Sequence, residues 1–309
     1  MNTASQVLVL FFLMFTGFIC AKIKLTGPEM ARHFSSFIIN ITLPAMLFVS
    51  FQRPFSQELL REGGTAFFLS ALVYGFSFLT AFVYPRILRM KGPERGVHRY
   101  ALIISNSGFI GYPMVEAVLG PSYLFHAVIF NIPYSLLAFS ICAWLISKEG
   151  QSSLRLTWKT FFNPNVIATS LGLGCFIFSL RLPEPLFRAL KMTGDMTSPL
   201  SMILIGTTLA QANIRQVFGR WQVYVSTAMR LLILPVAVGL IFYLLGIRGP
   251  LFVMGVLITA MPAGSSTSIL ASLYQTAAEE ASSLVFLSTL FCIITVPVVL
   301  SLADMAGVL

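Results

Sequence analysis

Two stretches of polar and helix-breaking residues, each inside a long apolar segment, decide the fold of this chain. The first is Asn106-Ser107-Gly108-Phe109-Ile110-Gly111-Tyr112-Pro113, and the second is Met261-Pro262-Ala263-Gly264-Ser265-Ser266-Thr267. Proline lacks a backbone N–H and clashes with the carbonyl four residues earlier, so each stretch is expected to interrupt a helix. Unpaired backbone groups are costly in hydrocarbon. The interruptions must therefore be buried in protein or line a wet cavity.

The composition of the surrounding chain is typical of a membrane protein. Of its 309 residues, 57% are hydrophobic and only 10% are charged, whereas soluble domains contain about 25% charged residues. So few charges could not cover the surface of a soluble globule. This excludes an ordinary cytosolic enzyme, a nucleic-acid binder and a disordered tail. With a mean hydropathy of +0.86, the chain is expected to cross the lipid bilayer many times.

Hydropathy, turn residues and charges divide the chain into ten apolar segments. These are Ser5–Ala21, Phe34–Phe51, Thr65–Tyr84, Tyr100–Leu119, Ser122–Ile146, Asn165–Leu180, Met196–Ala210, Trp221–Leu245, Pro250–Leu273 and Ala281–Leu302. The sequence therefore predicts an all-α membrane protein with two five-helix repeats, residues 1–147 and 164–309, joined by a cytoplasmic linker at 148–163. Because each repeat has an odd number of helices, a shared fold requires the repeats to be inverted.

Matching motifs support the inverted repeat. Ile41-Thr42-Leu43-Pro44-Ala45-Met46 in the second segment corresponds to Met196-Thr197-Ser198-Pro199-Leu200-Ser201 in the seventh. The two interrupted segments are the fourth and the ninth, again at matching positions. Pro199 follows Pro44 by 155 residues, and Pro262 follows Pro113 by 149. Such a small change of offset is what differences in loop length would produce.

The distribution of basic residues predicts the orientation of the helices. The loops after the odd-numbered segments contain 13 Lys and Arg residues, and the opposite loops contain 6. The positive-inside rule then places the first set in the cytoplasm and both termini outside it. The first six residues also lack the basic region of a cleaved signal peptide, so we expect the first segment to be retained as a helix.

The two interruptions are expected to meet near the middle of the membrane. At 1.5 Å per residue, Pro113 lies about 20 Å from Tyr100 at the cytoplasmic end, and Pro262 lies about 18 Å from Pro250 at the outer end. Helix N-termini at such a crossing would present N–H groups and a positive dipole to an anion. Inverted repeats with broken helices are typical of secondary transporters. The alternative is that Gly and Pro only kink two packed helices.

The expected ligand is a small organic anion, and the candidate binding residues lie in or near the interruptions. Arg230, inside the eighth segment, would neutralise a carboxylate or pair with an acidic residue, unless it is interfacial. Glu116 is a candidate for proton coupling. The full set of candidate substrate-binding residues is Asn106, Ser107, Gly108, Gly111, Tyr112, Pro113, Pro262, Ala263, Gly264, Ser265, Ser266, Thr267, Asn40 and Arg230.

The sequence contains no enzyme signature. The three histidines, His33, His98 and His126, are scattered, and motifs for metalloproteases, serine hydrolases and phosphate binding do not occur. The four cysteines lack C-x-x-C spacing, so we interpret them as packing residues. We therefore expect neither an enzyme nor a cofactor or metal site, and no ATP-driven pump. The sequence also shows no charged or carbonyl-lined selectivity filter of the kind that ion channels use. A membrane enzyme or a ligand sensor is the non-transporting alternative.

These motifs resemble the bacterial branch of the auxin efflux carrier family. The resemblance rests on Asn40–Ala45, Asn106–Pro113, Asn163-Pro164 and Met261–Ser265, and it covers essentially the whole chain. It implies ten helices in a five-plus-five inverted repeat, similar to the bile acid:sodium symporters, in which the fourth and ninth helices are broken and cross. It also implies a scaffold of helices one, two, six and seven, and a mobile transport bundle of helices three to five and eight to ten.

The family resemblance also implies a function. Plant members export auxin, whereas bacterial relatives are associated with malate, malonate or similar organic acids. The long cytoplasmic loop of the plant exporters is short here. We expect an inner-membrane carrier of a mono- or dicarboxylate with elevator-type alternating access, H⁺ or Na⁺ as candidate coupling ions, and a homodimer formed through the scaffold. No nucleic-acid partner is expected. A sodium-coupled symporter of the bile acid type is the alternative carrier.

Overall fold

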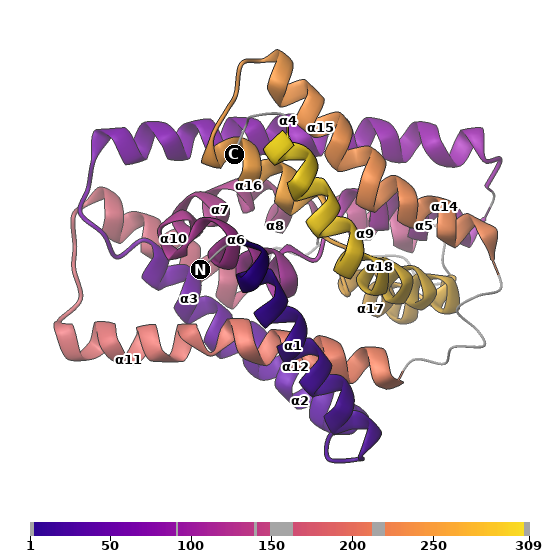
Figure 1. The fold of residues 1–309 in the computed structure, drawn as a ribbon, viewed down its shortest axis with the longest axis horizontal. Coiled ribbons are helices and arrows are strands. Elements are labelled where there is room, and N and C mark those ends of the chain that lie inside the picture. The colour runs from indigo at the N-terminus through magenta and orange to yellow at the C-terminus, as the bar shows by residue number, and fades with distance from the viewer. Residues whose placement is uncertain (1–2, 91, 139–140, 149–162, 212–219, 306–309) are drawn as a thin grey trace. The chain divides into compact units, whose positions relative to one another are not determined.

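The protein is a multi-pass helical membrane protein. The computed structural model describes residues 3–90, 92–138, 141–148, 163–211 and 220–305 (Figure 1). Within them, four helices are long and apolar enough to cross a membrane: Pro28–Ser50, Gln57–Ile87, Trp221–Leu244 and Ala278–Leu302. Shorter apolar helices are Val7–Lys22, Pro121–Phe130, Pro164–Ile177 and Pro250–Thr259. The expected all-α membrane architecture is confirmed, while the number of ten spans stays a prediction.

The chain forms two compact units, and each draws on both halves of the sequence. Unit 1 consists of Met1–Phe67, Gly108–Phe130 and Phe162–Gln211, and unit 2 of Phe68–Ser107, Asn131–Phe161 and Ala212–Leu309. One boundary falls inside helix α4 (Gln57–Ile87) and another inside η2 (Ser107–Gly111). Most of the linker predicted at 148–163 lies outside the described residues.

In unit 1, helix α1 (Thr3–Lys22) packs closely against α12 (Thr197–Gln211), as Figure 1 shows. A Cβ atom at Gly17 would lie 2.0 Å from the carbonyl oxygen of Ile203, and one at Gly206 would lie 1.8 Å from that of Met14. The hydroxyl of Thr207 donates to the Gly17 carbonyl at 3.2 Å. Small residues therefore let the two backbones touch, which is a common way to join helices in lipid.

The rest of unit 1 is built around the second predicted segment. Helix α2 (Pro28–Phe37), η1 (Ile38–Thr42) and α3 (Leu43–Ser50) follow one another without a break. Helix α3 packs against α10 (Pro164–Ile177) and α11 (Glu184–Asp195). Asn163 caps α10, since its side-chain oxygen accepts from two N–H groups of the first turn. The unit also contains α6 (Tyr112–Leu119), η3 (Pro121–Tyr123) and α7 (Leu124–Phe130).

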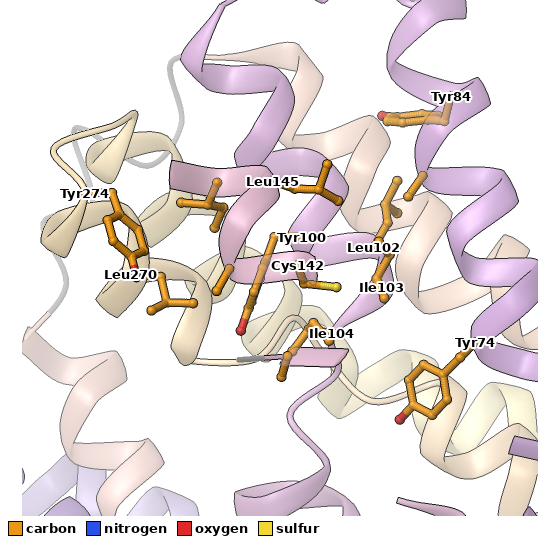
Figure 2. Packing of buried hydrophobic residues seen from close by; sticks show 14 of the residues in the cluster. Tyr74, Tyr84, Tyr100, Leu102, Ile103, Ile104, Cys142, Leu145, Leu270 and Tyr274 are labelled. Carbon is orange, nitrogen blue, oxygen red and sulfur yellow. The ribbon is translucent and has the colours of Figure 1, made fainter. Parts of the chain in front are cut away.

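Unit 2 has its own apolar core. Figure 2 shows Tyr100 of α5 (Pro93–Ile103) between Leu270 of α17 (Ser266–Leu273) and Cys142 of α9 (Ile141–Ser147). Together with Leu102, Ile103 and Ile104 these residues form a buried cluster. The remaining elements are α8 (Ile132–Ala138), α14 (Trp221–Ala228), η5 (Met229–Ile233), α15 (Leu234–Leu244), α16 (Pro250–Thr259) and α18 (Ala278–Met305).

Three π-helical segments each end two residues before a proline. Segments η1, η2 and η5 precede Pro44, Pro113 and Pro235 respectively. The proline ring cannot tolerate the carbonyl four residues earlier, and a wider turn moves that carbonyl aside. In these places proline therefore widens the helix without breaking it, which matters for the position of the first interruption.

Candidate functional site

The two interruptions in unit 2 join as a short antiparallel crossing. Helix α5 ends at Ile103, and Ile104 is extended with φ −99° and ψ 110°. Ser105 and Ala263 then face each other in an isolated antiparallel β-bridge. The Asn106 N–H donates to the Pro262 carbonyl at 2.8 Å, and the Gly264 N–H donates to the Ile104 carbonyl at 3.0 Å. Each interruption thus satisfies backbone groups that the other has left unpaired.

The first interruption lies upstream of the predicted position. The sequence predicts a break at Pro113, but the helix is interrupted at Ile104–Asn106, and η2 leads from Ser107 directly into α6. Gly111, which precedes α6, has helical angles of φ −62° and ψ −50°, so no new helix starts at Pro113. The expectation was wrong because a π segment accommodates this proline, whereas the residues that do break the helix include none.

Arg230 holds the ends of both broken helices. It lies in η5 and only 2% of it is exposed. Its Nε donates to the Met261 carbonyl at 3.1 Å, and its Nη1 donates to the Leu102 carbonyl at 2.8 Å. Carbonyls in the last turn of a helix lack intrahelical partners and carry the negative end of the dipole. The guanidinium of this single residue in η5 therefore stabilises both interruptions.

Within the described residues, no carboxylate balances the positive charge of Arg230. Among the described residues it forms no ion pair, and the titratable groups that act on it are the phenols of Tyr74 and Tyr134. Removing a charge from water costs several kcal/mol unless it is paired. The two carbonyl bonds offset part of that cost. A buried cation of this kind favours the binding of an anion beside it.

Directly after the crossing, helix α17 begins with unused hydrogen-bond donors. Ser265 makes no side-chain cap, and no described hydrogen bond uses the main-chain N–H of Ser265 or Ser266. The Thr267 hydroxyl is buried without a partner in the described part of the chain. Tyr100 donates its hydroxyl to Ser266 Oγ at 3.0 Å. Free N–H groups at a helix N-terminus are suited to an anion.

The remaining predicted site residues are placed as follows. Gly108, Gly111, Tyr112 and Pro113 lie in unit 1, in η2 and α6. Glu116 of α6 accepts a hydrogen bond from Ser198 at 2.8 Å. Asn40 is exposed in η1, and its amide donates to the Ser36 carbonyl at 2.8 Å. The roles of these residues in binding and coupling stay predictions.

Three residues outside the predicted set also build the crossing. The Tyr100 hydroxyl donates to Ser266 Oγ, and the Leu102 carbonyl accepts a hydrogen bond from Arg230. Ser288 of α18 accepts a hydrogen bond from the Ala263 N–H at 3.1 Å. A backbone carbonyl carries no sequence signal. The Tyr100 hydroxyl could have been suspected, because it lies in an apolar segment close to the first interruption.

Proteins that are similar to this chain over nearly its whole length are named as transporters. The family described as "Membrane transport protein" matches residues 3–300. A protein of Methanothermobacter thermautotrophicus named "Uncharacterized transporter" is 27% identical over 309 residues, which cover 96% of this chain and 97% of that protein. A Rhizobium meliloti protein named "Putative malonate transporter" is 22% identical over 304 residues, with 94% and 92% covered. YfdV of Escherichia coli, named "Uncharacterized transporter YfdV", is 21% identical over 300 residues, with 94% and 95% covered.

Proposed function

Because the chain belongs to the membrane transport protein family, the auxin efflux carrier family that its motifs resemble, we propose that it is a secondary active carrier of a small organic anion. The observation that carries this proposal is the buried Arg230 at the crossing of two broken helices, which has no carboxylate partner among the residues that the structure describes. The pattern of broken helices with binding groups at their ends is typical of secondary transporters.

A carboxylate matches the donors that unit 2 offers. Of the five N–H donors of a guanidinium, the described bonds of Arg230 use those of Nε and Nη1, both to carbonyls. The remaining donors, the N-terminus of α17 and the Thr267 hydroxyl would bind the oxygens of a mono- or dicarboxylate. The relative named as a malonate transporter supports a dicarboxylate.

For alternating access we propose the elevator scheme, with ten spans in two inverted repeats. Exchange of the repeats would convert the first segment into the sixth and the second into the seventh. The observed contact of α1 with α12 would thereby become the observed contact of α10 with α3. Unit 1 contains the first, second, sixth and seventh segments, which supports their role as the scaffold. The third, fourth and fifth segments are divided between the units, and the eighth, ninth and tenth lie in unit 2. We propose helices three to five and eight to ten as the moving bundle.

The proposed setting is the inner membrane, with both termini outside the cytoplasm and a homodimer formed through the scaffold. Candidate coupling ions are H⁺ and Na⁺. A sodium-coupled symporter of the bile acid type is the closest rival, and a membrane enzyme or sensor is the rival of another class. A counterflow assay separates these functions, because it requires movement of an unchanged solute.

The experiment uses the full-length protein in liposomes preloaded with unlabelled malonate, succinate, acetate or lactate. Uptake of the matching ¹⁴C-labelled anion is measured with and without Na⁺. We expect exchange of at least one anion, with strong loss in Arg230→Ala and partial retention in Arg230→Lys, since Lys keeps the charge but loses the planar donor set. Absence of exchange for every anion, or normal exchange by Arg230→Ala, would contradict the proposed site.

A further inference from the structure

A chain of hydrogen bonds in unit 2 links a buried histidine to an exposed arginine. The two ring nitrogens of His98, on α5, lie 2.6 Å from Ser226 Oγ and 2.8 Å from Glu280 Oε1. Glu280 Oε2 accepts from Arg220 Nη1 at 2.7 Å, and Arg220 also bonds Glu94. At the other end, the Tyr84 hydroxyl lies 2.8 Å from Ser226 Oγ. We name Tyr84, Ser226, His98, Glu280, Arg220 and Glu94 the His98 network.

Burial and charge single out the imidazole of this network. The His98 side chain is fully buried and the Glu280 side chain is 2% exposed, whereas the Arg220 side chain is 52% exposed. The Glu280 carboxylate raises the pKa of the Arg220 guanidinium. Two carboxylates and one guanidinium leave the network with one net negative charge when His98 is neutral. A single proton on His98 would neutralise it, and histidine exchanges protons in the physiological pH range.

Other charged and titratable groups lie on α5 and on the helices packed against it. On α5 itself, the Arg99 guanidinium lies over the Phe82 ring at 4.7 Å, and Arg95 has interactions of its own. On α18, Glu279 is exposed. Helices α9 and α17 also pack on α5. Cys142 of α9 and Tyr274, the residue after α17, belong to the apolar cluster around Tyr100. In the described chain, Glu280 is the one acidic group bonded to His98.

Protonation would reverse a hydrogen bond inside the network. A neutral His98 that donates from Nε2 to Glu280 must accept at Nδ1, so the Ser226 hydroxyl donates to it and accepts from Tyr84. A protonated His98 donates at both nitrogens. The Ser226 hydroxyl would then have to turn its hydrogen away from His98. The added proton thus changes the hydrogen bonding of α14 as well as the charge.

The network lies one helical turn from the candidate site. His98 and Leu102 are four residues apart on α5, and Ser226 and Arg230 are four residues apart across α14 and η5. Residues with this spacing stack along one helix face. The contact of His98 with Ser226 and that of Leu102 with Arg230 are therefore successive rungs between the same two helices. The third helix, α18, carries both Glu280 and the Ser288 hydroxyl bonded at Ala263.

From these contacts we propose that His98, paired with Glu280, is the proton-binding site that couples anion transport to the proton gradient. The proton would come from the cytoplasmic water at Arg220 and Glu94 and bind an imidazole nitrogen, with no covalent step. This inference rests on the proposed carrier function. It assigns the coupling role to His98 in place of Glu116, whose described partner is Ser198.

The arrangement of Ser226, His98 and Glu280 also resembles a hydrolytic triad, but its geometry favours proton exchange. Ser226 is fully buried, and its Oγ lies within hydrogen-bond distance of both His98 and Tyr84. A nucleophile must be reached by its substrate. A proton can pass along hydrogen bonds to such a buried position, whereas an ester cannot enter it without unpacking α5 from α14.

The first test detects the proton directly and needs no transported substrate. The chain has only three histidines, so ¹⁵N-histidine labelling of the full-length protein in lipid nanodiscs gives spectra that His98→Gln and His126→Gln assign. We expect the His98 signals to change from one protonated nitrogen to two between pH 9 and pH 5. In Glu280→Gln the His98 signals should differ from those of the wild type, because the group bonded to Nε2 is no longer a carboxylate. A His98 signal that stays constant over this range would overturn the proposal.

The second test measures coupling, with ¹⁴C-malonate in proteoliposomes whose membrane potential is held at zero. With one coupled proton, a gradient of one pH unit supports about tenfold accumulation. We expect His98→Gln to lose this response and to keep malonate counterflow. His126→Gln is the matched control, since His126 is also buried and pairs with a glutamate, Glu62, at 2.9 Å.

The outcomes separate the two proposals. If the wild type shows no counterflow of any tested anion, the carrier function fails, while the spectra still decide whether His98 binds a proton. If counterflow is present and His98→Gln keeps its full response to the pH gradient, the coupling proposal is overturned. Should His98→Gln fail to fold, Glu280→Gln replaces it. This variant removes the carboxylate bonded to His98 Nε2, and an unchanged pH response in it would also contradict the proposal.

Discussion

Arg230 donates a hydrogen bond from Nη1 to the main-chain carbonyl of Leu102, 2.8 Å away and 128 residues earlier in the chain. The same side chain binds the Met261 carbonyl through Nε. One charged group thus holds the ends of both broken helices and presents its remaining donors beside them. A substitution of Arg230 would therefore affect both the structure of the crossing and the binding of an anion at the site.

Arg230→Met should remove the thermal stabilisation that the protein gains when it binds its anionic substrate. A ligand at 100 times its dissociation constant stabilises a protein by about 2.7 kcal/mol, so the wild type should melt at a higher temperature with saturating malonate or another exchanged anion. The variant should show no such shift, whatever its own stability. Arg248→Met is the control, because Arg248 also donates to carbonyls, those of Tyr243 and Ile247, but is exposed. An anion-dependent shift in Arg230→Met would exclude Arg230 from the binding site.

The two prolines that the sequence paired should differ in their effect on transport. Pro262→Ala changes a residue whose carbonyl accepts from Asn106 at the crossing, and it allows the end of α16 to propagate as a helix. Pro113→Ala changes a residue that already lies in a continuous helical stretch. We expect counterflow to fall at least about tenfold, or about 1.4 kcal/mol, in Pro262→Ala and less in Pro113→Ala. The reverse order would place the functional break at Pro113.

Gly264→Ala should impair transport through crowding at the crossing. The new methyl group would lie 3.1 Å from Ile104 Cγ2 and 3.3 Å from the Ser105 carbonyl oxygen. Overpacking of this kind costs about 1–3 kcal/mol. Gly75→Ala, also in unit 2, meets no heavy atom of the described chain within 4 Å and should transport normally. Initial rates of counterflow at equal protein density compare the two. Equal rates would show that the crossing has room for a side chain.

Contact between α1 and α12 should depend on glycine. Gly17→Ala and Gly206→Ala each place a methyl group within 2.0 Å of a backbone carbonyl oxygen, so the helices must separate. We expect a lower thermal unfolding temperature for both variants in detergent, by a free energy of about 1–3 kcal/mol or more. In the control Gly64→Ala, no heavy atom of the described residues lies within 4 Å of the new methyl group, so its unfolding temperature should match or exceed that of the wild type. No destabilisation in either variant would indicate that α1 and α12 do not touch in the membrane.

The C-terminus should lie outside the cytoplasm. The 13 basic residues of one set of loops against 6 in the other favour this orientation. A reporter fused after Leu309 that is active only in the periplasm should therefore be active, and one that fluoresces only in the cytoplasm should be dark. A cytoplasmic readout would contradict the orientation and, with it, the odd number of helices in each repeat.

Some features of this protein follow from its sequence alone. The scarcity of charges and the long apolar segments determine a helical membrane protein, because only helices satisfy the backbone of such segments in lipid. The Met261–Thr267 motif determines an interruption, which the structure places between Thr259 and Ser266. The buried position of Arg230 could also be suspected, since one basic residue within an apolar segment is conspicuous.

Other features depend on the tertiary structure, because they join atoms that local sequence does not relate. The break at Ile104 exists because the Ile104 carbonyl and the Asn106 N–H form hydrogen bonds with Gly264 and Pro262. Pro113 is the stronger local signal, but a π-helical segment accommodates it without a break. In the sequence, His98 is one of three scattered histidines and precedes the apolar segment Tyr100–Leu119. It became a candidate proton site only when folding placed Ser226 on one of its nitrogens and Glu280, 182 residues away, on the other.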